Sequence, residues 1–254
     1  MVDLTWGMLL FVLAGGFLAA FVDSVVGGGG LISVQVLLVA GLPPHIALGT
    51  NKLASSFSSL TSTLSFWKAG KIDLKLVRGL IPFTVIGAMC GTALVQRVPS
   101  GFLRPLVIIM LFAVMIYTLF RKQWGDVQTY SSLTAKAGIL MLLAALSLGF
   151  YDGFFGPGTG SFLIFAFLLL GFDFVQAAGN AKALNFSSNV TSLITFALFG
   201  TIDYRIGLAM GAAMVCGSLL GSQLAIRKGS RYVRPLFVGV CCLLIGKQVW
   251  DFFH

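Results

Sequence analysis

The chain has 254 residues, of which 57% are hydrophobic and only 10% are charged, and its mean hydropathy is +0.97. A soluble domain carries about 25% charged residues, so this composition excludes a water-soluble fold and indicates a protein surrounded by lipid. The formal net charge is +9, but the basic residues stand at the ends of apolar segments, where they mark membrane topology. We therefore expect no nucleic-acid partner.

Apolar segments of the first half are expected to form helices at about 6–26, 31–40, 45–67, 74–96 and 103–120. A helix that crosses the hydrocarbon core needs about 20 residues. The second segment has ten and rises only about 15 Å. Because Gly27 to Gly30 precede it and glycine breaks helices, we expect a re-entrant hairpin with a glycine tip near mid-membrane. Two alternatives stay open: the glycines only allow close helix packing, or the short segment crosses.

The second half repeats this layout, with segments expected at about 135–155, 161–170, 174–199, 204–226 and 235–250. Here Gly156-Pro157-Gly158-Thr159-Gly160 precedes the short segment, and proline strengthens the break because it lacks an N–H. We expect an N-terminal membrane repeat (1–122), a polar linker (123–134) and a C-terminal membrane repeat (135–254), together forming one integral membrane domain. The expected fold is all-α, with about five helical segments and one broken or re-entrant glycine-rich helix pair in each repeat.

The two halves align residue by residue. Asp23 corresponds to Asp152 at an offset of 129 residues, and one inserted residue then moves the offset to 130. The later pairs include Gly49/Gly179, Lys52/Lys182, Ser58/Ser188, Asp73/Asp203, Gly87/Gly217 and Gly91/Gly221. A duplicated membrane chain with charges and helix breaks at matching places is typical of transporters. The last two pairs have GxxxG spacing, which indicates close helix contact within one chain or between two chains.

The basic residues also predict orientation. If each hairpin enters and returns on one side, one end of the molecule collects only Arg97, Arg104 and Arg205. The other end collects eleven: Lys68, Lys71, Lys75, Arg78, Arg121, Lys122, Lys136, Arg227, Lys228, Arg231 and Arg234. By the positive-inside rule this asymmetry favours inverted-topology repeats. We therefore expect a multi-pass protein of the cell inner membrane with both termini outside the cytoplasm.

Lys52 and Lys182 are the strongest functional candidates. Each lies about eight residues into the third segment of its half, roughly 12 Å along a helix. An unpaired ammonium group in hydrocarbon costs at least ~3 kcal/mol, so we expect both lysines to face a polar cavity. The alternatives are snorkelling to the interface or structural pairing with Asp23 or Asp152.

The neighbours of the lysines suit an anion. The short helices are expected to begin at the glycine tips, so their free N–H groups and positive dipole ends point to mid-membrane. With two lysines, this predicts a compact positive site. The candidate substrate-binding residues are Lys52, Lys182, Asn51, Asn180, Gly28, Gly29, Gly30, Gly158, Thr159, Gly160, Ser55 and Asn185. Asp23 and Asp152 could pair with the lysines, cap the tip amides or carry a coupled proton.

No enzyme motif stands in a suitable context. The four cysteines lie in apolar segments and are interpreted as packing residues. We therefore expect no catalytic residue, no cofactor and no metal site.

The halves resemble the TauE/SafE family of membrane permeases, also called the toluenesulfonate uptake permease family. The resemblance rests on the stretch from Asp23 to Gly30, GTNK at 49–52, the glycine-rich stretch at 156–160 and GNAK at 179–182. It implies transport of sulfite, sulfonates or related organosulfur anions, often as export. Thr50-Asn51 becomes Asn180-Ala181 in the second half, so the two half-sites are not equivalent.

These observations predict a secondary active transporter of a small anion that works by alternating access. The resemblance narrows the anion to a sulfur-containing one. Proton coupling and a homodimer stay open, as do an anion channel and an uptake permease for another small oxyanion or carboxylate.

Overall fold

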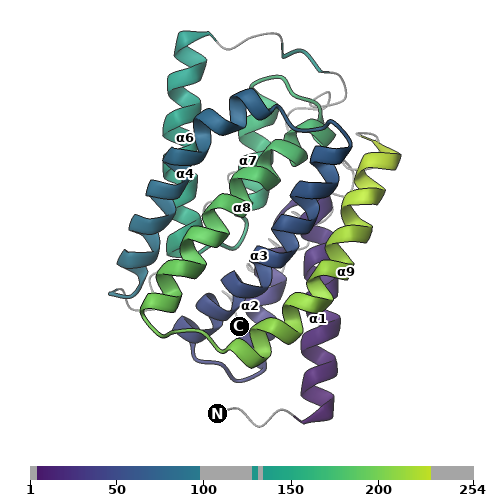
Figure 1. Ribbon diagram of the computed structural model, residues 1–254, viewed down its shortest axis with the longest axis vertical. Helices are drawn as coiled ribbons and strands as arrows, with labels where there is room; N and C mark the ends of the chain where they lie inside the picture. The colour runs from purple at the N-terminus through teal and green to yellow at the C-terminus, as the bar shows by residue number, and fades with distance from the viewer. Residues whose placement is uncertain (1–4, 98–127, 131–133, 230–254) are drawn as a thin grey trace, which may run out of the picture.

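The computed structural model describes residues 5–97, 128–130 and 134–229, and this part of the chain contains eight helices and no strand. The first half contributes α1 (Trp6–Val26), α2 (Gly29–Val39), α3 (Pro44–Lys68) and α4 (Leu74–Val95). The second contributes α6 (Ala135–Phe154), α7 (Thr159–Leu169), α8 (Phe174–Leu198) and α9 (Tyr204–Lys228) (Figure 1). Every helix bound lies within two residues of its predicted segment. The predicted segments 103–120 and 235–250, and most of the linker 123–134, lie outside the described residues.

Equivalent residues begin equivalent helices in the two halves. The hydroxyls of Thr5 and Thr134 cap α1 and α6, and each accepts a hydrogen bond from a first-turn backbone N–H. The carboxylates of Asp73 and Asp203 cap α4 and α9 in the same way. Ser, Thr and Asp are favoured here because their oxygens satisfy amides that have no partner within the helix.

Four helices of the described chain, α1, α4, α6 and α9, are long and apolar enough to cross a membrane. The helices α3 and α8 have 25 residues each, enough for about 37 Å, but they are more polar. Many of their polar side chains are buried, among them Lys52, Ser58, Lys182, Asn185 and Ser188. These polar residues of α3 and α8 therefore face the protein interior, not the surroundings.

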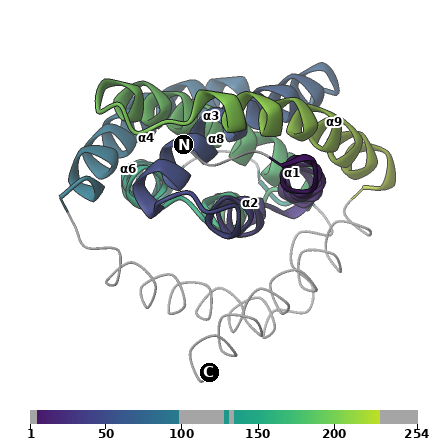
Figure 2. The same cartoon turned by 90° about the horizontal axis from the view of Figure 1, so that it is seen from below.

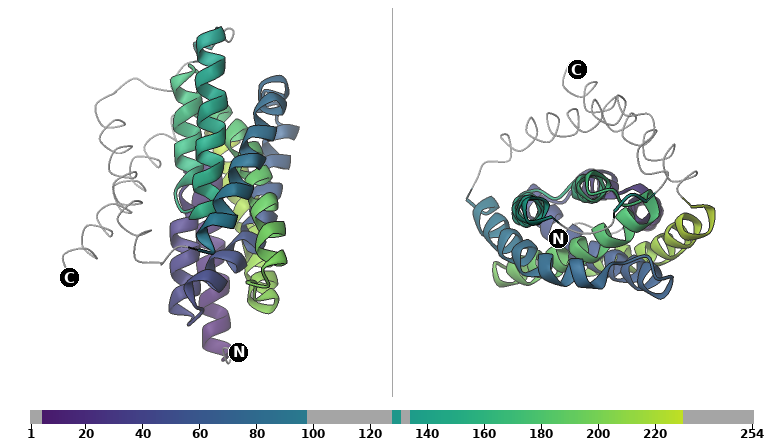
Figure 3. Two further views of the ribbon diagram at one scale, coloured as in Figure 1. Left: turned by 90° about the vertical axis from the view of Figure 1, so that its left-hand side faces the viewer. Right: turned by 90° about the horizontal axis from the view of Figure 1, so that it is seen from above.

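The helices form two layers. Figures 2 and 3 show α3, α4, α8 and α9 in one curved layer and α1, α2, α6 and α7 in a second layer packed on its inner side. At the edges, α4 packs on α6 and α9 packs on α1. The last described helix of each half thus packs on the first helix of the other half, so the halves are interlocked.

The GxxxG glycines make these edge contacts within one chain. A Cβ on Gly87 would lie 2.1 Å from the carbonyl oxygen of Leu146, and a Cβ on Gly217 would lie 2.1 Å from that of Phe17. Only glycine allows backbones to approach so closely. The sequence left open whether the GxxxG contacts lie within one chain or between two chains. The structure shows them within one chain, between α4 and α6 and between α9 and α1.

The chain turns back at the two glycine stretches. Gly27 and Gly28 separate α1 from α2 with φ values of +75° and +81°, and Gly156 and Gly158 have φ values of +92° and +87° between α6 and α7. Such φ values favour glycine, which has no Cβ to clash. Figures 1 and 3 show α1 and α2 toward the end of the molecule that holds the start of α1, and α6 and α7 toward the opposite end.

The two turns touch each other. A Cβ on Gly27 would lie 2.3 Å from the backbone nitrogen of Ser161. The Ser161 hydroxyl donates a hydrogen bond of 3.1 Å to the carbonyl oxygen of Val26. We call the segments 27–30 and 156–160 the glycine tips. Their contact brings both breaks to one place in the interior.

Candidate functional site

Two buried ion pairs connect the halves beside the glycine tips. Lys52 Nζ lies 2.9 Å from Asp152 Oδ2, and Lys182 Nζ lies 2.5 Å from Asp23 Oδ2. Each pair joins a lysine of a long polar helix to an aspartate in the last turn before the other half's glycine tip. A buried charge is tolerated when it is paired and hydrogen-bonded.

This pairing corrects the prediction of a compact positive site. The lysines are buried, at 2% exposure for Lys52 and 0% for Lys182, but an aspartate balances each of them. The four charges therefore sum to zero when all are ionised. Of the interpretations that the sequence left open, the geometry supports pairing with the lysines for both Asp23 and Asp152. For Asp23 it also supports capping of a tip amide, the backbone N–H of Gly29.

The Lys52–Asp152 pair is enclosed by polar side chains of α8. The Ser188 hydroxyl lies 2.5 Å from Asp152 Oδ2 and donates to it. Lys52 Nζ donates to Asn189 Oδ1 at 3.2 Å, and the Asn189 amide donates to Asn185 Oδ1 at 3.3 Å. Charge-assisted hydrogen bonds of this kind compensate for the loss of hydration.

In the Lys182–Asp23 pair, the aspartate is more exposed than the aspartate of the other pair. The Asp23 side chain is 17% exposed, compared with 2% for Asp152. Its second oxygen, Oδ1, accepts a hydrogen bond of 3.2 Å from the backbone N–H of Gly29. The start of α2 therefore binds a carboxylate of the protein itself, as expected for the positive end of a helix.

A small pocket lies between the ion pairs and the tips. Its volume is about 20 Å³, close to the space that a single water molecule needs. It is lined by Asp23, Gly30, Asn51, Lys52, Ser55, Asp152, Gly156, Gly158, Gly160, Asn185 and Asn189. The pocket is therefore narrow, and a polyatomic ligand requires it to widen.

Most of the predicted site residues meet at this pocket, but five do not line it: Gly28, Gly29, Thr159, Asn180 and Lys182. Gly28, Gly29 and Thr159 shape the turns, and Lys182 is buried behind Asp23. Whether the lining residues bind substrate stays a prediction.

Asn180 contacts the protein backbone instead of the pocket. Its Oδ1 accepts a hydrogen bond of 2.7 Å from the backbone N–H of Asp73, and Thr50 Oγ1 accepts one of 2.9 Å from that of Asp203. Thr50 and Asn180 are equivalent in the repeat, and each holds the turn before the other half's next helix. This geometry favours a structural role for Asn180 over the substrate contact that we predicted.

Two lining residues were absent from the predicted set. Asn189 stands four residues after Asn185, on the same face of α8, and this spacing could have identified it. A Cβ on Gly156 would lie 3.0 Å from Lys52 Nζ. Sequence alone does not show that contact, because it depends on how α3 packs against the second glycine tip.

Residues 5–97, 128–130 and 134–229 contain no group of three or more His, Cys, Asp or Glu side chains that could hold a metal ion. Cys90 and Cys216 are exposed free thiols, while Cys241 and Cys242 lie outside the described part.

Comparison with known proteins identifies the family. The model of the family described as "Sulfite exporter TauE/SafE" matches residues 12–247. Over essentially its whole length the chain is 38% identical to a Sinorhizobium protein named "Probable membrane transporter protein ORF9", of which it covers 97%. It is 36% identical to a Haemophilus influenzae "Probable membrane transporter protein", with 99% of each chain covered.

A third relative is "Probable membrane transporter protein YfcA" of Escherichia coli K12, at 35% identity over 96% of this chain and 90% of the relative. No solved structure matches the chain significantly. The family match extends over nearly all of the sequence, and it agrees with the resemblance that the two lysine motifs and the glycine tips suggested. The chain is therefore a membrane protein that belongs to the TauE/SafE sulfite exporter family.

Proposed function

We propose that this protein is a secondary active transporter of a small anion, with sulfite, a sulfonate or a related organosulfur anion as its substrate. The family description names sulfite export, and the relatives bear transporter names. The observation that carries the proposal is the narrow polar pocket beside two lysine–aspartate pairs, each of which joins the two halves. Such a pocket between broken helices is where transporters hold their substrates.

The repeats are proposed to have inverted topology in the membrane. In support, the two helix pairs α1–α2 and α6–α7 approach the tips from opposite ends of the molecule (Figure 1). The sequence pattern predicts eleven basic residues at one end of the molecule, and seven of them belong to the described residues. All seven lie at the end formed by the last turns of α3 and α9: Lys68, Lys71, Lys75, Arg78, Lys136, Arg227 and Lys228. The positive-inside rule makes this the cytoplasmic end of an inner-membrane protein.

Alternating access would come from movement of the helices around the tips. The pocket is too small for an oxyanion in the present conformation, and the tips are in contact. The family description, which names an exporter, and the transporter names of the relatives favour a carrier over the anion channel.

Proton coupling follows from the charge balance. An anion entering a pocket whose charges already sum to zero would add a buried negative charge without compensation, which is costly. A proton on Asp152 releases Lys52, and the anion then takes the place of the carboxylate. Anion and proton would therefore move in the same direction, as in a symporter.

Flux measurements in proteoliposomes test this proposal. We expect saturable sulfite uptake that shows counterflow and increases when the outside is made acidic relative to the inside. Unsaturable flux without counterflow would indicate a channel. If the protein transports small carboxylates or other oxyanions but not sulfite, the proposed substrate class is wrong. If the flux does not depend on the proton gradient, transport is not coupled to protons.

A further inference from the structure

A second cavity lies far from the tips, between the last turns of α3 and α9. It encloses about 500 Å³, and its lining includes Leu64, Lys68, Leu219, Gln223, Ile226 and Arg227. It shares no residue with the pocket at the ion pairs. We call this cavity the α3–α9 groove.

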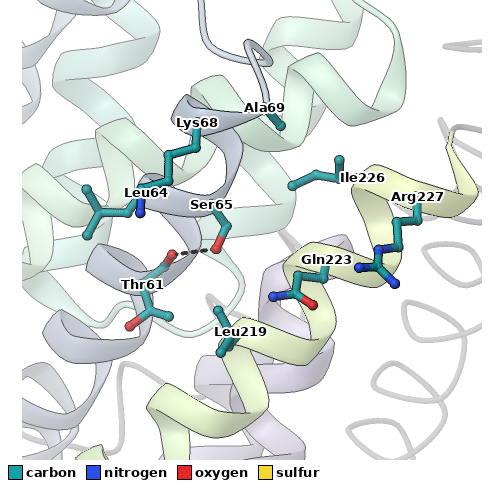
Figure 4. Close-up of a pocket in the computed structure, with 9 residues that line it drawn as sticks. All are labelled: Thr61, Leu64, Ser65, Lys68, Ala69, Leu219, Gln223, Ile226 and Arg227. Carbon is teal, nitrogen blue, oxygen red and sulfur yellow. Dashed lines mark hydrogen bonds between the residues drawn. The ribbon is translucent and has the colours of Figure 1, made fainter.

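The groove combines an apolar floor with a basic mouth. Figure 4 shows Lys68 extending from α3 and Arg227 from α9 on its two sides, while Gln223 and Ile226 extend from α9 toward α3. Leu64 and Leu219 lie further along the helices, away from their basic ends. Neither cation forms an ion pair with an acid in the described part of the chain.

The repeat shows that the fold itself does not require this chemistry. Lys68 corresponds to Leu198 in the other half, and Gln223 corresponds to Ala93. Only Arg227 has a basic counterpart, Arg97. A basic residue in the last turn of a helix does favour the helix dipole, but that effect would apply equally at position 198, where the chain has an exposed leucine.

From this arrangement we propose that the α3–α9 groove binds an anionic phospholipid. The phosphate of the headgroup would bind Arg227 with the Gln223 amide as a further donor, and the Lys68 side chain, whose ammonium end turns toward Leu64 in Figure 4, would turn toward α9 to contact it. An acyl chain would cover Leu64, Leu219 and Ile226. The argument is charge complementarity at one end of an elongated apolar surface. It uses the membrane orientation of the proposed function, which places this end at the cytoplasmic leaflet, where anionic lipids are found.

The expected contribution of the cations is measurable. A basic residue near an anionic membrane surface contributes about 1 kcal/mol, which corresponds to about fivefold in affinity per residue. Removal of both should therefore weaken binding by about 25-fold at low ionic strength. Increasing salt should reduce this difference.

The experiment is native mass spectrometry of the purified full-length protein in detergent, with dioleoyl phosphatidylglycerol or the zwitterionic dioleoyl phosphatidylcholine added. The double variant Lys68→Gln/Arg227→Gln should retain far less phosphatidylglycerol than the unaltered protein. The matched control Arg97→Gln/Arg205→Gln removes two exposed cations from the opposite end and should retain as much as the unaltered protein.

A further variant tests whether the lipid binds in the groove itself or is attracted only by the positive charge of this end of the molecule. Leu219→Trp keeps both cations and fills the groove, so it should also lose phosphatidylglycerol. Full retention by Leu219→Trp, or equal loss in the Arg97/Arg205 control, would overturn the proposal. Equal retention of the two lipids would also overturn it, as would unchanged bound lipid in the Lys68/Arg227 variant. Because no transport is measured, the result is independent of whether the protein carries sulfite.

Discussion

The repeat relates the two lysine–aspartate pairs, yet their surroundings differ. Asp152 is almost fully buried, and both it and Lys52 bind polar side chains of α8. Asp23 is partly exposed and binds the start of α2 instead. Lys52 lines the pocket, whereas Lys182 does not.

The difference arises from a few side chains of α3 and α8. Asn185 and Asn189 of α8 correspond to Ser55 and Ser59 of α3, and the longer amides reach the pocket around Lys52. Ser188 donates to Asp152, but its counterpart Ser58 has a hydroxyl with no hydrogen-bond partner among the described residues. Duplication thus preserved the charges while the surroundings of the two pairs diverged, and we propose that the exchangeable contact is the one at Lys52.

Substitution of the two lysines is the strongest test of this comparison. Lys52→Ala should abolish flux and cost about 3–5 kcal/mol in the free energy of unfolding, because it leaves a buried carboxylate without compensation. Lys182→Ala should cost less, since Asp23 is partly exposed and keeps its backbone hydrogen bond. Denaturant unfolding in detergent, together with sulfite flux, measures both effects.

Lys75→Ala, at an exposed lysine of α4, is the control and should behave as the unaltered protein. The double variant Lys52→Ala/Asp152→Ala should recover part of the stability that Lys52→Ala loses, because no unpaired charge remains. Equal costs for Lys52→Ala and Lys182→Ala would show that the two pairs do not differ as we infer.

Amide substitutions of the aspartates distinguish the pairs by their pH response. Asn imitates a protonated Asp in size and lacks the charge, so Asp152→Asn should transport without stimulation by a proton gradient. Asp23→Asn should keep that stimulation, although its stability falls. Flux as a function of external pH checks this expectation, and persistence of the gradient response in Asp152→Asn would exclude Asp152 as the proton carrier.

A glycine substitution extends the comparison to the tips. Gly27 has a φ of +75° and a ψ of −177°, a conformation that essentially only glycine adopts and that costs another residue ~1–3 kcal/mol. Gly27→Ala should destabilise the protein by more than this amount, because its Cβ would also meet the backbone nitrogen of Ser161 at 2.3 Å. Gly70→Ala is the matched control, with a φ of +66° and no atom within 4 Å. Thermal unfolding compares the two, and equal midpoints would mean that the tips are not in contact.

The smallest effects are expected at Thr50 and Asn180. Thr50→Ala and Asn180→Ala should each cost about 1 kcal/mol for one lost hydrogen bond and leave the sulfite concentration for half-maximal flux unchanged. Asn51→Ala, at a residue that lines the pocket, should change that concentration. A raised half-maximal concentration in Asn180→Ala would restore Asn180 as a substrate contact.

The helix positions could be predicted because local signals agree with each other. Apolar length, the glycine runs and capping residues such as Asp73 mark the same boundaries, so each predicted helix of the described chain lies within two residues of its place. The site was predicted less completely. Lys52 and Asp152 were identified because charged residues in apolar segments are rare, but the polar contact between Asn180 and Asp73 has no local signal.

The amino-acid sequence by itself determined a duplicated helical membrane protein with two breaks and four internal charges, because composition and periodicity depend only on the chain. Tertiary packing alone decided which lysine meets which aspartate, since each pair joins residues a hundred or more positions apart. It also decided that the pocket is narrow and that its charges are balanced by the ion pairs. Net charge at a site depends on distances between side chains, and a linear pattern does not contain those distances.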